Sequence, residues 1–265
     1  MSKTRVVING AAGRMGQRLI ALGTADSDLQ IVAALDYAGH PAIGEDAGQI
    51  AGSGTIGVPL AAELACDADV VIDFSVPAGA DAATRLCRER GIPLVAATTG
   101  LTDEQKTALK TAAETVPIVW APNMSMAVNL TMKLSQVAAD VLKDNATGTD
   151  VEIIERHHRF KKDAPSGTAL HFGEIIARAM GQTQHTHGRQ GIVGERPRDE
   201  IGYHALRVGD NPGEHTIVFG LLGETIELTV RATNRDCYAL GALAAAKFLA
   251  VQPPGLYGMD DVLGL

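Results

Sequence analysis

The sequence contains few cysteines, and this shortage excludes two classes of protein. Among its 265 residues there are three cysteines, Cys66, Cys87 and Cys237, and they are widely spaced. Three unpaired, distant thiols form neither a disulfide framework nor a zinc motif. His185-Thr186-His187 has a spacing seen at metal sites, but no cysteine or carboxylate lies close by, so we interpret it as a polar loop. We therefore expect no metal site.

The sequence also lacks an excess of positive charge and any long apolar segment. Its 23 Lys and Arg residues against 31 Asp and Glu residues give a net charge of -8, which argues against a nucleic-acid partner. The most apolar C-terminal stretch, residues 238–246, stops at Lys247 and is too short to cross a bilayer. Met1-Ser2-Lys3-Thr4 leads directly into a predicted strand, so we expect no signal peptide and no membrane partner. We expect a soluble, cytoplasmic protein.

The N-terminal region carries a pattern typical of dinucleotide binding. A short apolar strand, Arg5-Val6-Val7-Ile8, runs into Asn9-Gly10-Ala11-Ala12-Gly13-Arg14-Met15-Gly16, after which apolar residues recur at helical spacing. Glycines between a strand and a helix allow a tight turn, the approach of a pyrophosphate and close helix–strand packing. A second strand, residues 31–35, ends at Asp36, about twenty residues beyond the last glycine, where a carboxylate can accept the ribose hydroxyls.

Strands and helices alternate through the first half of the chain, which predicts a parallel sheet with helical crossovers. Further strands are expected at residues 68–74, 93–97 and 116–120. Ligands of such sheets bind beyond the carboxyl ends of the strands. These ends fall at residues 10–16, Asp36, and residues 75–77, 98–100 and 121–124.

The pattern changes after residue 126. A helix is expected at 127–143, a strand at 150–156, a helix at 168–180 capped by Ser166, and strands at 202–208, 215–222 and 224–231. The helix from residue 238 would return to the first domain. We predict an α/β protein: a Rossmann-type parallel-sheet domain for dinucleotide binding, and an α+β domain with an open, mainly antiparallel sheet for substrate binding and oligomerisation. Their expected bounds are residues 1–126 with 236–265, and residues 127–235.

A cluster of positive charge stands out against the acidic background. Residues 157–162 hold five basic or titratable side chains and crowd like charges around Lys161. Pro165-Ser166-Gly167-Thr168 follows as a turn and a helix start, whose N–H groups can bind an anion. A basic surface loop is the alternative interpretation. The sequence therefore indicates a site for a small carboxylate ligand.

These motifs resemble the dihydrodipicolinate reductase family, now usually called 4-hydroxy-tetrahydrodipicolinate reductases. The resemblance rests on Glu155-x-His157-His158-x-x-Lys161-x-Asp163-Ala164-Pro165-Ser166-Gly167-Thr168-Ala169 and on the N-terminal glycine pattern, and it covers nearly the whole chain. It implies NAD(P)H-dependent reduction of a cyclic, imine-containing dicarboxylate in lysine and diaminopimelate biosynthesis. It also implies a homotetramer joined through the second sheet.

The resemblance assigns roles by position. His157 matches the family's general acid/base and Lys161 its second proton donor, while His158, Gly167 and Thr168 match its substrate-binding positions. Its cofactor-binding positions fall on Gly10, Ala11, Ala12, Gly13, Arg14 and Met15 at the phosphates, and on Ala97, Thr98, Thr99, Ala121, Pro122, Asn123 and Met124 at the nicotinamide.

Asp36 bears on the choice of cofactor. A carboxylate there accepts two ribose hydroxyls and repels a 2′-phosphate, and the next residue is Tyr37 instead of a basic one. We predict NADH as the preferred cofactor, with NADPH as the other. Phe160 replaces a frequent histidine of the family, and Ala97 replaces a frequent glycine.

Two other functions remain open at this point. One is a different NAD(P)-dependent dehydrogenase of an amino-acid pathway, which would need neither the paired histidines nor the Pro-Ser-Gly-Thr turn. The other is a non-catalytic nicotinamide-binding regulator, which would lack the titratable pair His157 and Lys161.

Overall fold

The computed structural model describes residues 2–265, and the chain divides into two compact units. Unit 1 contains the residues up to Met126 together with Arg235–Leu265, and unit 2 contains Ala127–Asn234. Within the described residues, no helix is long and apolar enough to span a membrane.

Unit 1 is built on a parallel sheet. Its strands are β1 (Thr4–Asn9), β2 (Leu29–Leu35), β3 (Leu60–Ala61), β4 (Val70–Asp73), β5 (Leu94–Ala96), β6 (Pro117–Trp120) and β12 (Gly255–Tyr257). They form one sheet in the order β12-β6-β5-β4-β1-β2-β3, with every neighbouring pair parallel. The strand order reverses at β1, so the crevice beside the ends of β1 and β4 is where such sheets bind ligands.

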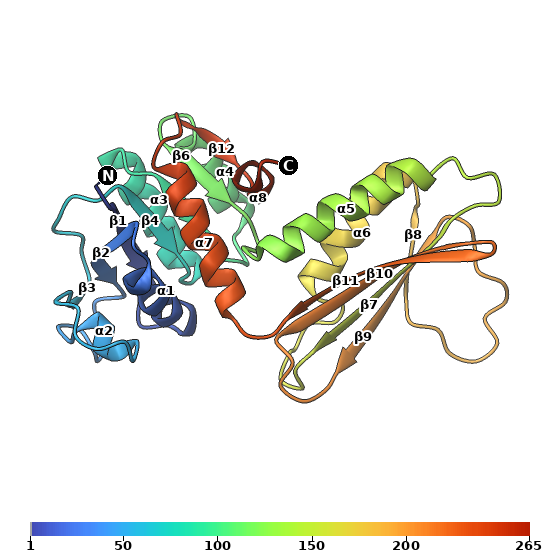
Figure 1. Ribbon diagram of the computed structural model, residues 1–265, viewed down its shortest axis with the longest axis horizontal. Coiled ribbons are helices and arrows are strands. Elements are labelled where there is room, and N and C mark those ends of the chain that lie inside the picture. Colours follow the sequence, from blue (N-terminus) through green and yellow to red (C-terminus); the bar gives the residue numbers. More distant parts are fainter. Residues whose placement is uncertain (1) are drawn as a thin grey trace. The chain divides into compact units, whose positions relative to one another are not determined.

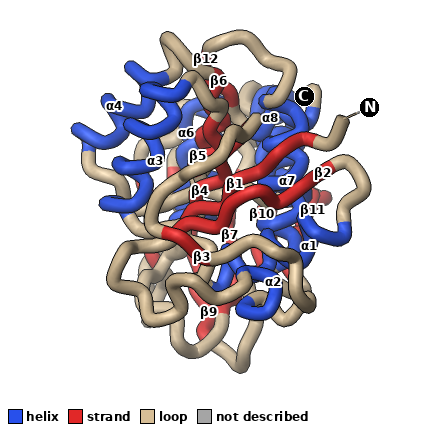
Figure 2. The backbone as a smooth tube through the Cα atoms, turned by 90° about the vertical axis from the view of Figure 1, so that its left-hand side faces the viewer, coloured by secondary structure: helices blue, strands red, loops and turns tan. Residues whose placement is uncertain are grey.

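Helices cover both faces of this sheet. They are α1 (Arg14–Ala25), α2 (Ala47–Ile50), α3 (Pro77–Arg90), α4 (Asp103–Ala112), α7 (Asp236–Leu249) and α8 (Met259–Leu263). Figure 2 shows α3 and α4 on one side of the strands, and α1, α7 and α8 on the other. Because side chains alternate along a strand, Val6 and Ile8 of β1 enter the core under α1 and α7, while Val7 enters the core under α3 and α4. Burial on both faces explains why β1 reads as a continuous apolar run.

Unit 2 contains a mixed sheet with two helices. Its elements are α5 (Met126–Leu142), β7 (Asp150–His157), α6 (Gly167–Met180), β8 (Gln184–His187), β9 (Glu200–Arg207), β10 (Gly213–Leu221) and β11 (Glu224–Ala232). The strand order is β11-β10-β7-β9-β8, and α5 and α6 lie along one face (Figure 1). Strand β10 is antiparallel to both of its neighbours, whereas β9 is parallel to β7 and to β8.

Two details of unit 2 differ from the pattern predicted from the sequence. The sequence predicted mainly antiparallel pairing, but the crossover through α6 returns the chain to run parallel to β7. His185-Thr186-His187, predicted as a loop, belongs to the edge strand β8. Its polar residues resemble a loop because an edge strand is largely open to solvent.

Candidate active site

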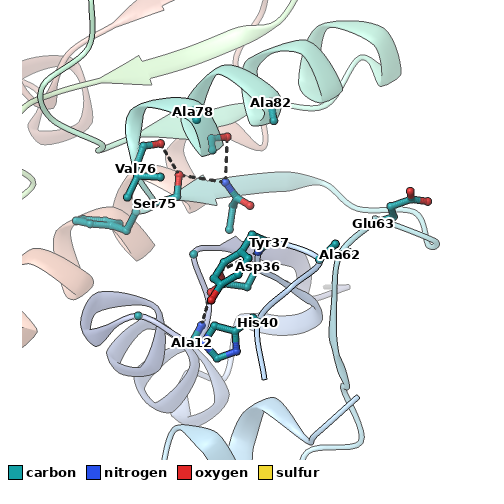
Figure 3. A pocket seen from close by; sticks show the side chains of 16 residues that line it. Ala12, Asp36, Tyr37, His40, Ala62, Glu63, Ser75, Val76, Ala78 and Ala82 are labelled. Carbon is teal, nitrogen blue, oxygen red and sulfur yellow. Dashed lines mark hydrogen bonds between the residues drawn. The ribbon is translucent and has the colours of Figure 1, made fainter. Parts of the chain in front are cut away.

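A cavity of about 820 Å³ opens at the carboxyl ends of the central strands of unit 1. Its wall includes Gly10, Ala12 and Gly13 after β1, Asp36 and Tyr37 after β2, and Ser75 and Gly79 near β4. Figure 3 shows side chains of this wall, with Tyr37 and His40 beside Asp36. The rings of Tyr37 and His40 meet edge to face, with 5.4 Å between their centroids. His40 was not predicted as a site residue, because a lone histidine in a loop has no recognisable spacing.

The glycines of the turn are required by backbone packing. Gly10 has φ +79°, and a Cβ on it would lie 2.6 Å from the carbonyl oxygen of Phe74. A Cβ on Gly16 would collide with the carbonyl oxygen of Gly10 and with the backbone of Ala11. The chain therefore turns tightly between β1 and α1 and brings the N-terminus of α1 to the cavity, where a phosphate could be held. These residues fit a dinucleotide.

Asp36 is tied to this turn. Its Oδ2 accepts a hydrogen bond from the backbone N–H of Ala12 at 3.0 Å, and its Oδ1 accepts one from the N–H of Tyr37 at 3.0 Å (Figure 3). The carboxylate is thus fixed at the end of β2, the position from which it can accept ribose hydroxyls.

A buried carboxylate lies next to the cavity and joins three strand ends. Asp73 is 1% exposed and accepts hydrogen bonds from Asn9 Nδ2 at 2.7 Å, Ser75 Oγ at 2.5 Å and Thr98 Oγ1 at 2.6 Å. Burial raises the pKa of Asp73, and these hydrogen bonds oppose that shift. The network fixes the ends of β1 and β4 and the residues after β5. Asp73 was not predicted as a site residue, because one aspartate within a predicted strand, residues 68–74, has no recognisable spacing.

The predicted cofactor residues differ in where the structure places them. Gly10, Ala12, Gly13 and Asp36 line the cavity. Ala11 and Met124 are buried in the core of unit 1, and Met15 packs against it. The other predicted positions do not line this cavity: Arg14, Ala97, Thr98, Thr99, Ala121, Pro122 and Asn123.

In unit 2, the basic run surrounds a second candidate site at the end of β7. His157 is 7% exposed, and its Nδ1 lies 2.6 Å from Oε2 of Glu155. Burial opposes ionisation of Glu155, but hydrogen bonds from His157 and Arg207 outweigh it and lower the pKa of Glu155 to about 2. This side chain is therefore a carboxylate at neutral pH.

The turn after the basic run begins a helix as the sequence predicted. Ser166 caps α6, and its Oγ accepts a hydrogen bond from the N–H of Ala169 at 3.2 Å. Gly167 is exposed in the first turn of this helix. Exposed N–H groups at a helix N-terminus attract carboxylates.

The remaining cations are arranged around this turn. Lys161 Nζ lies 2.9 Å from Oδ1 of Asp163, so its nearest charged partner is a carboxylate and not the other cations of the run. The Nδ1 of His158 is buried and has no hydrogen-bond partner among the described residues. Leaving a buried nitrogen unpaired is unfavourable, so an acceptor or donor on a bound ligand would stabilise it. In residues 2–265 no group of three or more His, Cys, Asp or Glu side chains could hold a metal ion.

Comparison with known proteins gives one consistent result. The family model described as "Dihydrodipicolinate reductase, N-terminus" matches residues 4–124, and "Dihydrodipicolinate reductase, C-terminus" matches residues 127–263. The 4-hydroxy-tetrahydrodipicolinate reductase of Rhodopirellula baltica is 57% identical over 98% of this chain and 96% of its own length. That of Hahella chejuensis is 47% identical, with 99% of both chains covered.

Solved structures agree with this result. A dipicolinate-bound dihydrodipicolinate reductase from Paenisporosarcina sp. TG-14 superposes with a TM-score of 0.79 at 27% identity, covering 98% of this chain and 99% of its own. An amine dehydrogenase from Mycobacterium smegmatis has a TM-score of 0.65 at 14% identity, with 98% of this chain and 96% of its own covered. At that identity the second likeness concerns the fold alone.

Proposed function

The chain belongs to the dihydrodipicolinate reductase family and is a nicotinamide-dependent oxidoreductase. We propose which of its residues bind the cofactor, which bind the substrate and which donate the proton. The substrate is 4-hydroxy-tetrahydrodipicolinate, or the dihydrodipicolinate derived from it, and the pathway is lysine and diaminopimelate biosynthesis. A reduced nicotinamide supplies the hydride. Unit 1 binds the dinucleotide through Gly10–Met15 and Asp36, and residues 97–99 and 121–124 contact its nicotinamide half.

NADH is the preferred cofactor in this proposal. Asp36 and Glu63 are among the residues that line the cavity, and none of its described lining residues is a lysine or arginine. A 2′-phosphate would meet negative charge there without a guanidinium or ammonium group to neutralise it.

Unit 2 binds the dicarboxylate and supplies the proton. Hydride addition leaves an electron pair on the ring, which takes up one proton from His157, with Lys161 as the second donor. The helix start at Gly167 and Thr168 and the unpaired ring nitrogen of His158 bind the substrate. The observation that carries this proposal is the gathering of a buried histidine, a lysine and a capped helix N-terminus at the end of β7.

The outer face of the second sheet supports a homotetramer. This face, opposite α5 and α6, carries Ile154 and Leu206, whose exposed fractions are 39% and 40%. Apolar side chains on an uncovered sheet face favour association with another copy. Light scattering of the purified protein would measure the subunit number. We also propose a cytoplasmic location, because Cys66, Cys87 and Cys237 are thiols and not disulfides, as is usual in a reducing compartment.

The direct test follows the loss of nicotinamide absorbance with freshly generated substrate. We expect rapid oxidation of NADH with the cyclic dicarboxylate and none with amino or semialdehyde substrates. Turnover of the latter alone would indicate a different dehydrogenase, and cofactor binding without turnover would indicate a regulator. A His157→Gln variant should bind cofactor normally and lose at least about tenfold in kcat, which separates loss of the acid from loss of the fold.

A further inference from the structure

The carboxylate of Glu155 is the centre of the buried polar cluster in unit 2. It is 1% exposed, and Arg207 donates to both of its oxygens, Nη1 to Oε2 at 2.7 Å and Nη2 to Oε1 at 2.8 Å. Oε2 also faces His157 Nδ1 at 2.6 Å, and Oε1 accepts from the backbone N–H of Ser166 at 3.0 Å. A buried carboxylate needs such partners, because burying an unpaired charge is strongly unfavourable.

The contact with His157 determines which ring nitrogen is available for chemistry. An ionised carboxylate can only accept, so Nδ1 of His157 must be the donor in this hydrogen bond. The other nitrogen, Nε2, is then left to exchange a proton with a ligand. The hydrogen bond also fixes the ring's orientation.

The contact with Ser166 links the same carboxylate to the anion-binding turn. Ser166 is the N-cap of α6, and its N–H is held by Oε1 of Glu155. One side chain therefore sets both the orientation of His157 and the position of the helix start that carries Gly167 and Thr168.

We propose that Glu155 is a positioning residue, which keeps Nδ1 of His157 as the donor to its own carboxylate, so that Nε2 is the nitrogen that delivers the transferred proton, and which anchors the turn that binds the substrate carboxylate. The inference rests on the proposed role of His157 as the proton donor. Arg207 balances the buried negative charge, so the pair can remain ionised away from water.

The other charged and titratable groups near His157 leave this assignment intact. His215, on β10, packs against the ring of His157, and burial lowers the pKa of His215 to about 4, so it is neutral at pH 7. Lys161 is paired with Asp163, and Arg207 is paired with Glu155. Glu155 is thus the carboxylate in hydrogen-bond contact with His157.

The wild-type protein provides the first test. Nitrogen-15 NMR of the ring of His157 should show Nδ1 as the protonated nitrogen in the neutral form. A predominant Nε2–H tautomer would overturn the proposal without the need for any variant. This readout does not depend on activity, so it stays informative if the proposed role of His157 fails.

The second test compares Glu155→Gln with a matched control, Glu152→Gln. Glu152 lies three residues away on the opposite face of β7 and accepts hydrogen bonds from Arg189, Arg196 and His204. Burial raises the pKa of Glu152, but these hydrogen bonds outweigh it and lower the pKa to about 2, as in Glu155. We expect Glu155→Gln to lower kcat at least about tenfold and to populate the Nε2–H tautomer, because the amide can donate where the carboxylate only accepts. Glu152→Gln should keep kcat within about threefold and leave the tautomer unchanged.

The outcomes separate the two hypotheses. If His157→Gln keeps more than about a tenth of kcat, the proposed acid role fails, whatever Glu155 does. If His157→Gln is inactive while Glu155→Gln retains wild-type kcat and tautomer, the positioning role is wrong. Equal losses of kcat in Glu155→Gln and Glu152→Gln, with the tautomer of His157 unchanged in both, would also overturn the positioning role, since they would indicate a general loss of stability.

Discussion

The imidazole rings of His157 and His215 meet edge to face, with centroids 5.2 Å apart and planes at 76°. His215 is 4% exposed and its Nε2 lies 3.1 Å from Oγ of Ser166. A neutral imidazole is favoured at such a position, because burial and the neighbouring His157 both disfavour protonation of His215. Two adjacent histidines therefore differ in their surroundings: His157 faces a carboxylate, and His215 is buried beside a serine hydroxyl.

Stability should fall as the pH is lowered from 7 to 5 because of His215. Its pKa is about 4 in the folded protein, against a reference value of 6.5. Between pH 4 and pH 6.5 the unfolded chain therefore binds more protons than the folded protein. The stability that neutral His215 contributes is complete above pH 6.5 and is lost as the pH falls towards 4. We expect a loss of about 2 kcal/mol in unfolding free energy between pH 7 and pH 5. Urea denaturation at both pH values would measure it.

A His215→Gln variant should lose most of this pH dependence, since glutamine does not titrate. His171→Gln is a suitable control, because His171 is half-exposed on α6 and pairs with Glu174. If the unfolding free energy of His215→Gln fell with pH as steeply as that of the wild-type protein, another group would be responsible for the pH dependence.

Lys161→Ala should lower kcat at least about tenfold, because it removes a proton donor from the ring-binding site. Its neighbour Lys162 is exposed, so Lys162→Ala is the matched control and should turn over substrate at close to the wild-type rate. Steady-state oxidation of NADH measures both. A loss smaller than tenfold in Lys161→Ala would exclude the assigned role.

Asp36→Asn should shift the cofactor preference towards NADPH. The amide oxygen of asparagine can still accept from the Ala12 N–H, so the turn stays intact while one negative charge is removed. We expect the ratio of KM values, NADPH over NADH, to fall about tenfold, the order of one like-charge interaction at a distance of about 4 Å in water. A wild-type protein that prefers NADPH tenfold would refute the underlying assignment.

Gly16→Ala should destabilise unit 1 and weaken cofactor binding. Its Cβ would collide with backbone atoms of Gly10 and Ala11, which cannot move without opening the turn. Gly23→Ala, on the same helix, meets side-chain atoms and no backbone, with the end of Ile31 at 2.9 Å and a methyl group of Leu243 at 3.5 Å. Both substitutions replace a glycine of α1 by alanine, so they gain the same helix propensity. The difference in unfolding free energy between the two variants therefore reports the collision in the turn. We expect this difference to reach about 2 kcal/mol by thermal or urea unfolding. Equal stability of the two variants would contradict this account.

Much of unit 1 was predictable because its signals are local. An apolar run, glycines and an amphipathic helix follow one another between residues 4 and 25, and the structure has β1, the turn and α1 there. The edge strands β3 and β12 were not predicted, since segments of two and three residues are too short to show an alternation. Their pairing is decided by the neighbouring strand.

The candidate site of unit 2 was predicted only in part. The basic run and the Ser166 cap are contiguous in the sequence, and the structure confirms the cap. The run suggested that like charges surround Lys161, whereas its partner is Asp163. Adjacent residues can point in different directions, so closeness in sequence does not fix closeness of charge.

The sequence by itself determined the family, the alternation of elements and the glycine turn, because each depends on residues within a few positions of one another. Tertiary structure decided the surroundings of His157. Arg207 and His215 lie 50 and 58 positions beyond it, and only the pairing of β7 with β9 and β10 brings them to Glu155. Strand register is set by which side chains of each strand must face the core and by the turns that join the strands, and the residues next to His157 in the sequence do not specify it.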